Sequence, residues 1–298
     1  MVRGQQPKIA QQAIAWLLLM FLCPAAWAAD KKPPVPVGAD PGGVKVAIIG
    51  AGIDYTQPEV ASRLARDGEG EIIGWDFIDD DRRPFARGSA DAPRILLSEG
   101  QSASLVVVAA NFAEPLSIAR ALRYAAQGPA RIIAVQAAWT NVELARILAE
   151  AARYFPNRLF IVGAGDDNRD LDADDPGGAP SPPRANIPAN VIIAAAAQFT
   201  GEIAKRSNSG ARTVDLAIDA TTHLPAGEPA IDALQASPSQ LALARLAALA
   251  ARLVAVAPEL DGAALKARIC ALARRVPGAK PSTKAGFIGE PWKPYWLE

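Results

Sequence analysis

The sequence has no excess of either charge. Its 298 residues include 31 Lys and Arg and 31 Asp and Glu, so the formal net charge is zero. Nucleic acids and anionic membrane surfaces attract proteins that carry an excess of basic residues. We therefore expect no nucleic-acid partner. Half of the residues are hydrophobic, which is enough to bury a full core in one α/β domain.

Cysteine and histidine are also scarce. The cysteines are Cys23 and Cys270, and the one histidine is His223. Cys23 lies in a predicted signal peptide, so its removal leaves Cys270 alone and no internal disulfide is expected. We interpret His223, which lies in a loop rich in Thr and Pro, as a solvated residue. The core must therefore stabilise the fold without a disulfide.

The first 28 residues are predicted to be an export signal. Arg3 and Lys8 are basic, and Ala13 to Cys23 form an apolar stretch too short to span a bilayer. Ala26-Trp27-Ala28 offers a small-x-small cleavage site. We expect a bacterial protein that is periplasmic or secreted, with no stable membrane anchor once residues 1–28 are removed.

The rest of the chain divides into a Pro-rich leader at 29–43, one domain at 44–276 and a C-terminal tail at 277–298. Short apolar runs alternate with helical periods in the domain, which indicates a parallel sheet covered on both faces. The predicted strands are 44–49, 71–77, 104–108, 131–135, 159–162, 191–195 and 213–216, and the predicted helices are 114–126, 141–154, 239–256 and 261–274.

Three segments carry a family resemblance. They are Leu159 to Asp167, which ends Gly163-Ala164-Gly165-Asp166-Asp167, then Asn190 to Ala194, and Ser207 to Leu216 with its Ser-Asn-Ser-Gly start. Their order resembles subtilisin-like serine proteases (subtilases, peptidase family S8). The resemblance covers about Val44 to Val276 and implies a three-layer α/β/α fold with a mostly parallel sheet of about seven strands.

The same resemblance places two catalytic positions on unsuitable residues. Val44 to Gly50 is similar to the family's first strand, and Gly50 takes the place of the catalytic Asp. Arg87 falls where the catalytic His is expected. A glycine has no carboxylate to orient a histidine, and an arginine stays protonated and cannot accept a proton as general base.

The nucleophile and the oxyanion donor are also replaced. Counting back from Ala257-Pro258, Gln240 aligns with the catalytic serine, whereas a shift of one residue would put Ser239 there. We interpret Ser237 as the N-cap of a helix with Pro238 in its first turn. Asp166 replaces the Asn that donates to the developing oxyanion, and an ionised Asp offers only acceptors.

Two alternatives remain open. One is an active serine endopeptidase, subtilase or sedolisin-like, in which Ser239 serves as nucleophile and Glu99 is considered as a base at low pH. The other is a dinucleotide-binding protein, because Gly50-Ala51-Gly52 follows a hydrophobic strand. Tyr55 stands where the third glycine of that fingerprint would be, and Asp76 is the acidic residue that follows.

The hypothesis that fits these substitutions best is a catalytically inactive pseudoprotease that acts by binding a peptide or an envelope protein. Gly50, Arg87, Asp166 and Gln240 mark the disabled site, with Ser239 as the fallback nucleophile. We expect no cofactor and no metal. Trp139, which follows the strand that flanks substrate in the family, is expected in the core.

Overall fold

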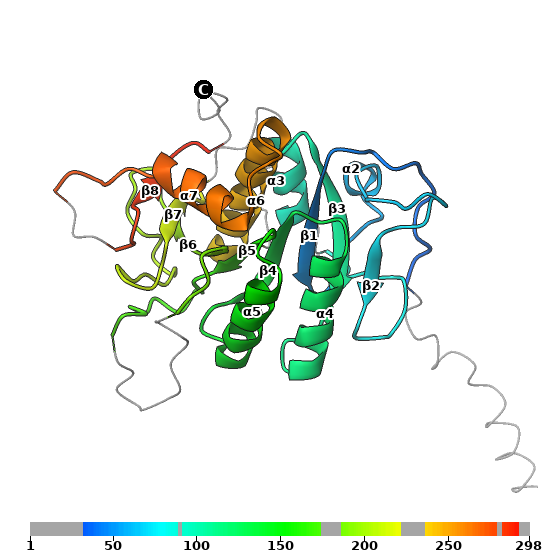
Figure 1. Ribbon diagram of the computed structural model, residues 1–298, viewed down its shortest axis with the longest axis horizontal. Coiled ribbons are helices and arrows are strands. Elements are labelled where there is room, and N and C mark those ends of the chain that lie inside the picture. The colour runs from blue at the N-terminus through cyan, green and yellow to red at the C-terminus, as the bar shows by residue number, and fades with distance from the viewer. Residues whose placement is uncertain (1–31, 89–90, 174–185, 222–235, 279–281, 292–298) are drawn as a thin grey trace, which may run out of the picture. The chain divides into compact units, whose positions relative to one another are not determined.

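The structure is a computed structural model that describes residues 32–88, 91–173, 186–221, 236–278 and 282–291. The predicted signal peptide and His223 lie outside these ranges. Within them the chain forms an eight-stranded parallel sheet with the order β2-β3-β1-β4-β5-β6-β7-β8 (Figure 1). The strands are β1 (Val44–Gly50), β2 (Gly74–Asp76), β3 (Ala103–Ala109), β4 (Ile132–Ala138), β5 (Leu159–Gly163), β6 (Val191–Ala197), β7 (Leu216–Asp219) and β8 (Phe287–Ile288).

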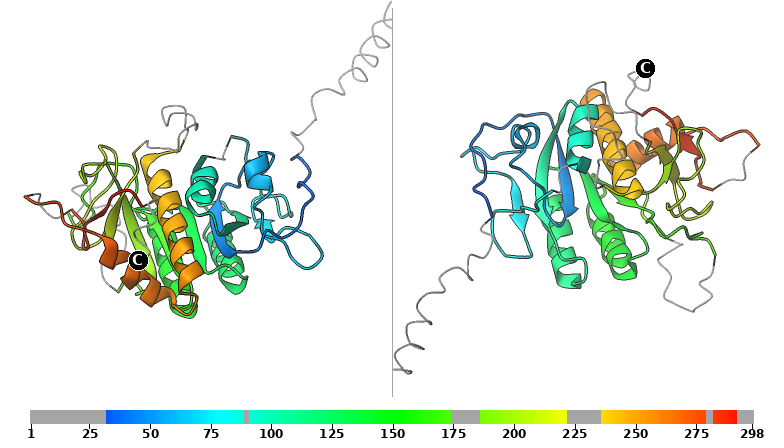
Figure 2. Two further views of the ribbon diagram at one scale, coloured as in Figure 1. Left: turned by 90° about the horizontal axis from the view of Figure 1, so that it is seen from above. Right: turned by 180° about the vertical axis from the view of Figure 1, so that it is seen from behind.

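Helices cover both faces of the sheet. They are α2 (Pro58–Ala61), α3 (Asp91–Glu99), α4 (Pro115–Gln127), α5 (Val142–Tyr154), α6 (Pro238–Val256) and α7 (Gly262–Leu272). Alternate residues of a strand point to opposite faces. Val46 and Ile48 of β1 accordingly pack in the cluster of α3, α6 and α7, and Ala47 and Ile49 pack with α4 and α5. Figure 2 gives two further views, with α6 in orange and α4 and α5 in green.

The predicted three-layer α/β/α class is confirmed. Helices α2 and α3 were not predicted, β2 is shorter than the predicted run at 71–77, and the other differences lie at the end of the sheet. The run at 213–216 was predicted as a strand, but β7 begins only at Leu216, because Thr213 and Val214 lie in a turn that closes on Gly210. The strand β8 was not predicted, since it consists of two residues within the tail at 277–298.

The helix starts follow signals that are visible in the sequence. Asn141, Ser237 and Asp261 each accept a backbone N–H three residues further on, from Leu144, Gln240 and Ala264. Such caps satisfy backbone donors that a helix start leaves without an intrahelical partner. The predicted cap Ser237 is thereby confirmed.

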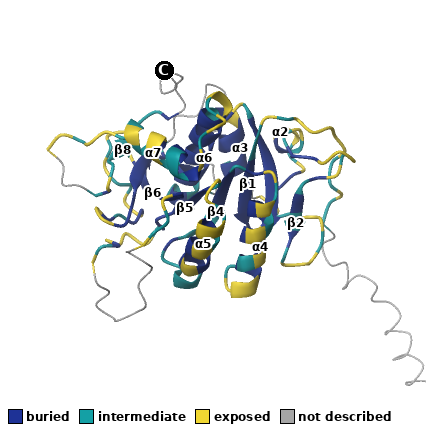
Figure 3. Cartoon of the chain, viewed as in Figure 1, coloured by how far each residue is buried: buried dark blue, intermediate teal, exposed yellow. Residues whose placement is uncertain are grey.

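The central helix α6 is apolar on all sides. It is the one helix in the described residues whose length and composition would allow it to cross a membrane, but 78% of its apolar window is buried in the protein. Figure 3 shows it dark blue over most of its length. A helix that is hydrophobic all round belongs in a core, and α6 packs against β1, β4, β5 and β6.

The leader is partly packed. The compact unit that holds the domain starts at Pro34, so packing begins before the first strand. Arg66, which is 5% exposed, donates to the carbonyls of Pro36 and Gly70, and its own N–H donates to the Asp40 carboxylate. Val44 therefore marks the start of the sheet, while the contacts of the domain begin at Pro34.

Candidate functional site

The predicted site residues lie at the carboxyl ends of the central strands. In open parallel sheets this edge, near the point where the strand order reverses, is where ligands bind. Two cavities occur there, of about 240 Å³ and 140 Å³, and Gln136 of β4 and Gln240 of α6 line both. Arg87 lines the larger cavity, and Asp166 and Ser239 line the smaller one.

Gly50, which we predicted to stand in place of a catalytic Asp, is the last residue of β1. A Cβ atom built on Gly50 would collide with the side-chain oxygen of Gln136 on the neighbouring strand β4. Gln136 therefore occupies the space that a carboxylate at position 50 would need. The space beside Gly50 is thus filled by a neutral amide.

Arg87 lines the larger cavity together with Asp91 and Pro93 at the start of α3. The described residues contain no histidine, because His223 is the one histidine in the chain. The guanidinium of Arg87 donates hydrogen bonds but accepts none. Arg87 is therefore suited to holding an acceptor group and cannot take a proton from Ser239.

Ser239 and Asp166 are in direct contact in the site. The Ser239 hydroxyl donates to Asp166 Oδ1 at 3.0 Å, and the Ser239 backbone N–H donates to the same oxygen at 3.1 Å. Both donors point out from the first turn of α6, where the helix dipole favours a negative charge. The Asp166 carboxylate thus acts as an internal anion at the N-terminus of this helix.

Gln240 has a different role from Ser239. Its backbone N–H donates to the Ser237 hydroxyl at 3.4 Å, and its side-chain oxygen accepts the Ser237 N–H at 2.9 Å. This reciprocal pair is a capping box. Ser239, and not Gln240, is the residue that contacts Asp166, so the structure brings together the pair that results from a shift of one residue in the alignment.

Asn208 holds the loop that carries Asp166. Its side-chain oxygen accepts the N–H groups of Asp167 and Arg169, at 3.1 and 2.8 Å, and its amide donates to the Ala164 carbonyl at 3.0 Å. Asn208 is fully buried. The Ser-Asn-Ser-Gly segment therefore positions the loop at the end of β5.

The similarity of this chain to known proteins lies in its structure. No family model matches the sequence, and no curated protein matches it. Among solved structures, a cold-adapted subtilisin-like serine proteinase superposes with a TM-score of 0.59 at 16% identity, covering 85% of this chain and 91% of its own. The subtilase cytotoxin SubAB gives 0.60 at 18%, covering 86% and 89%. MycP1 from Mycobacterium smegmatis gives 0.55 at 19%, covering 85% and 79%.

This chain has the subtilisin-like fold. At these identities the likeness establishes the fold alone, so the chemistry must be argued from the residues of this chain. The strand order, the central helix α6 and the position of its first turn beside the end of β5 are the features that a subtilisin-like fold provides.

The structure argues against the dinucleotide interpretation of Gly50-Ala51-Gly52. A dinucleotide fingerprint leads directly into a long helix whose N-terminus holds the pyrophosphate. Here the next helix, α2, starts at Pro58 and has four residues. The carboxylate of Asp76, the acidic residue of that fingerprint, accepts the N–H groups of Ile78 and Asp79 at 2.7 and 3.1 Å.

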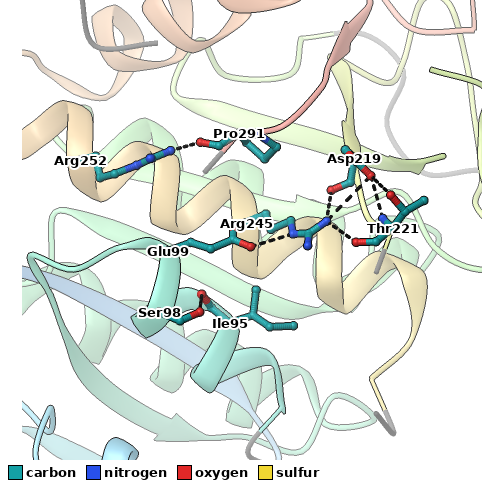
Figure 4. A network of polar contacts seen from close by, with 8 residues as sticks. All are labelled: Ile95, Ser98, Glu99, Asp219, Thr221, Arg245, Arg252 and Pro291. Carbon is teal, nitrogen blue, oxygen red and sulfur yellow. Dashed lines mark hydrogen bonds and ion pairs between the residues drawn. The ribbon is translucent and has the colours of Figure 1, made fainter. Parts of the chain in front are cut away.

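Glu99, considered as a base, is committed elsewhere. It is the last residue of α3, and its Oε1 accepts from Arg245 Nε at 3.0 Å (Figure 4). Arg245, 1% exposed, also donates to the carbonyls of Asp219 and Thr221 at 2.8 and 2.7 Å. Burial raises the pKa of the Glu99 carboxyl, although the charge of Arg245 opposes that shift. Glu99 thus belongs to a buried network behind the cleft.

Two further expectations concern aromatic side chains and metals. Trp139 is fully buried in the cluster beneath α4 and α5, as expected for a core residue. No group of three or more His, Cys, Asp or Glu side chains suited to a metal ion occurs in the described residues.

The sequence did not indicate Gln136 as a site residue, because only the packing of β4 against β1 shows that its side chain fills the space beside Gly50.

Proposed function

We propose that this protein is an exported, subtilisin-like pseudoprotease that binds a peptide or protein segment without cleaving it. The observation that carries the proposal is the double contact of Ser239 with Asp166. The N–H group at this helix start is the kind of donor that stabilises an oxyanion in acyl transfer. In this protein an intramolecular carboxylate already accepts it.

Electrostatics supports the same conclusion. A tetrahedral intermediate formed on Ser239 would place a negative charge beside the ionised Asp166. Two like charges a few ångströms apart repel, and a donor in that place would instead contribute about 3 kcal/mol of stabilisation. An Asp at position 166 therefore raises the activation barrier for forming the tetrahedral intermediate on Ser239.

The cleft supports binding because side chains leave part of it open. Its two cavities, of about 240 and 140 Å³, are lined by the amide side chains of Gln136 and Gln240. Side-chain amides offer both donors and acceptors, as a peptide backbone does. A bound segment would be oriented by hydrogen bonds in the absence of a nucleophile and base.

The test uses the chain from Ala29, incubated with unfolded casein and with a serine-reactive fluorophosphonate from acid to alkaline pH. We expect neither cleavage nor labelling, from protein shown folded by circular dichroism. The variants are Ser239→Ala and, as a matched control at an exposed site, Ser62→Ala. Cleavage that Ser239→Ala abolishes and Ser62→Ala leaves intact would show an active enzyme and end the proposal.

A second candidate is a hydrolase active in acid, and the Ser239–Asp166 hydrogen bond favours it. A protonated Asp166 would donate instead of accept, which would remove the repulsion described above. The same assay separates the candidates: acid-limited cleavage that is lost in Ser239→Ala, and that extends to neutral pH in Asp166→Asn because the amide donates at every pH, supports the hydrolase. Absence of cleavage in acid supports the pseudoprotease.

Export is part of the proposal and rests on residues 1–28. Among the structural neighbours, MycP1 is described as from the ESX-1 type VII secretion system, and another is the A-subunit of an AB5 toxin from E. coli. Fractionation of a bacterial host that expresses the full chain tests this. Recovery of a shortened protein outside the cytoplasm is expected, and retention of the full-length chain in the cytoplasm would contradict export.

A further inference from the structure

A larger cavity lies away from the cleft, on the outer face of α4 and α5. It is an open groove of about 780 Å³ between the two helices. Figure 1 shows these helices side by side in front of the sheet. Leu116 and Tyr154 line the groove and are 65% and 76% exposed. Apolar side chains gathered in an open groove are typical of an interaction surface.

The rim of the groove carries charges of both signs. Arg123 of α4 has no hydrogen-bond or ion-pair partner among the described residues. Glu150 of α5 is 61% exposed at its side chain and has one loose ion pair, with Arg146 Nη1 at 3.7 Å. Both Arg123 and Glu150 line the groove. Arg146 of α5 also lines the groove but is paired with Glu143 and Glu150, so among the described lining residues Arg123 on α4 is the unpaired cation and Glu150 on α5 the carboxylate.

The two helices match each other in length and direction. Each has 13 residues, and both run back from the carboxyl edge of the same parallel sheet, so they are parallel. Arg123 lies eight residues after Pro115, the first of α4, and Glu150 lies eight residues after Val142, the first of α5. Gln127 and Tyr154 are the last residues of the two helices. Arg123 and Glu150 therefore occupy the same position along their helices, and so do Gln127 and Tyr154.

We propose that a second copy of this chain covers the groove in an isologous dimer whose twofold axis runs parallel to α4 and α5. Such an axis preserves the height of each residue and places α4 of one copy on α5 of the other. Arg123 then meets the partner subunit's Glu150, and Tyr154 meets the partner subunit's Gln127. Each contact occurs twice.

The expected affinity follows from the size of the surface. Helices of 13 residues are about 20 Å long, which gives a patch at the small end of stable interfaces. We therefore expect a dimer that exchanges with monomer at micromolar concentration. The two Arg–Glu pairs would determine the register of the helices more than the total affinity.

The test is sedimentation velocity on the chain from Ala29, which contains the whole compact unit that starts at Pro34. We expect a concentration-dependent monomer–dimer equilibrium. Arg123→Glu and Glu150→Arg each place two like-charge pairs in the dimer and should weaken it by at least about tenfold. Glu259→Arg, an exposed charge reversal in the turn between α6 and α7, should leave it unchanged.

Mixing the two weakened variants gives the sharpest result. A dimer of one Arg123→Glu chain with one Glu150→Arg chain has opposite charges at both positions, so association should return on mixing. Sedimentation of the mixture then shows a heterodimer. A wild-type protein that stays monomeric, a dimer that neither reversal weakens, or variants that do not associate on mixing would each overturn the proposal.

Discussion

At the scale of single residues, Asp166 decides both the chemistry and part of the stability of the cleft. One of its oxygens accepts two donors from Ser239. We expect Asp166→Ala to lower the free energy of unfolding by about 1–3 kcal/mol, because these donors lose a charged acceptor. Urea denaturation measures the change, with Glu259→Ala as a surface control. Equal stability of both variants would mean that the contact contributes nothing.

Gln136 leads to a prediction about the Gly50 position. Gly50→Asp should destabilise the fold by about 1 kcal/mol, because the end of the flexible Gln136 side chain must move away from the new side chain. Gly50→Asp combined with Gln136→Ala should recover most of that loss, since the space is then free. A double-mutant cycle in thermal unfolding tests this coupling. Additive effects of the two substitutions would contradict it.

Asp54, beside the end of β1, gives a pH dependence. Burial raises the pKa of its carboxyl, but hydrogen bonds from the Thr56 hydroxyl and N–H, at 2.5 and 3.1 Å, outweigh burial and hold the pKa below its usual value. Its contribution is therefore present above the unfolded-state pKa and is lost as the pH falls through the folded-state pKa. The stability difference between wild type and Asp54→Asn should shrink on acidification. A difference that is constant with pH would refute this origin.

At the scale of elements, the network around Arg245 joins α3, α6 and β7 behind the cleft. Arg245→Met would leave the buried carboxylates of Glu99 and Asp219 without their cation, at a cost of about 3–5 kcal/mol. Because Glu99 can then take up a proton, the loss should be smaller in acid than at neutral pH. Denaturation at both pH values measures it, and Arg268→Met, at an exposed site on α7, is the matched control. A loss independent of pH would mean that Glu99 is not involved.

The elements also show what the sequence can predict. Buried strands such as β1 and β6 are continuous apolar runs, and the helix starts at Asn141 and Ser237 carry their own capping residues, so local chemistry predicts them. β8 has two residues, and only its pairing with β7 makes it a strand. Local patterns do not contain such long-range pairings.

At the scale of the whole molecule, the position of the cleft follows from the topology of the sheet. The chemistry of the cleft does not. The strand order places the ends of β1, β4 and β5 beside the first turn of α6, and the sequence resemblance predicted that arrangement. The Asp166–Ser239 contact and the Gln136 side chain at Gly50 depend on which residue faces which across these elements. The alignment alone left Ser239 and Gln240 as alternatives.

The C-terminal segment closes the sheet and so belongs to the fold. Ala217 of β7 donates its N–H to the Gly286 carbonyl at 2.8 Å, and Lys284 Nζ lies 3.0 Å from Asp215 Oδ1. Ile288 of β8 is fully buried. The segment that the sequence assigned to a separate tail thus covers the edge of β7 and satisfies its backbone groups, which would otherwise be open to pairing with other chains.

This arrangement predicts that truncation within the tail destabilises the whole domain. A chain that ends at Val276 loses β8 and the burial of Ile288, for which replacement of a buried Ile by Ala alone costs about 2–5 kcal/mol. It also exposes the edge of β7, so we expect a lower unfolding midpoint together with aggregation. A chain that ends at Pro291 is the control, because it keeps residues 282–291, and the difference between the two isolates their contribution. Thermal unfolding followed by circular dichroism and light scattering gives both readouts. If the two truncated chains unfold at the same temperature, β8 does not support the sheet, and the domain ends at Val276 as the sequence suggested.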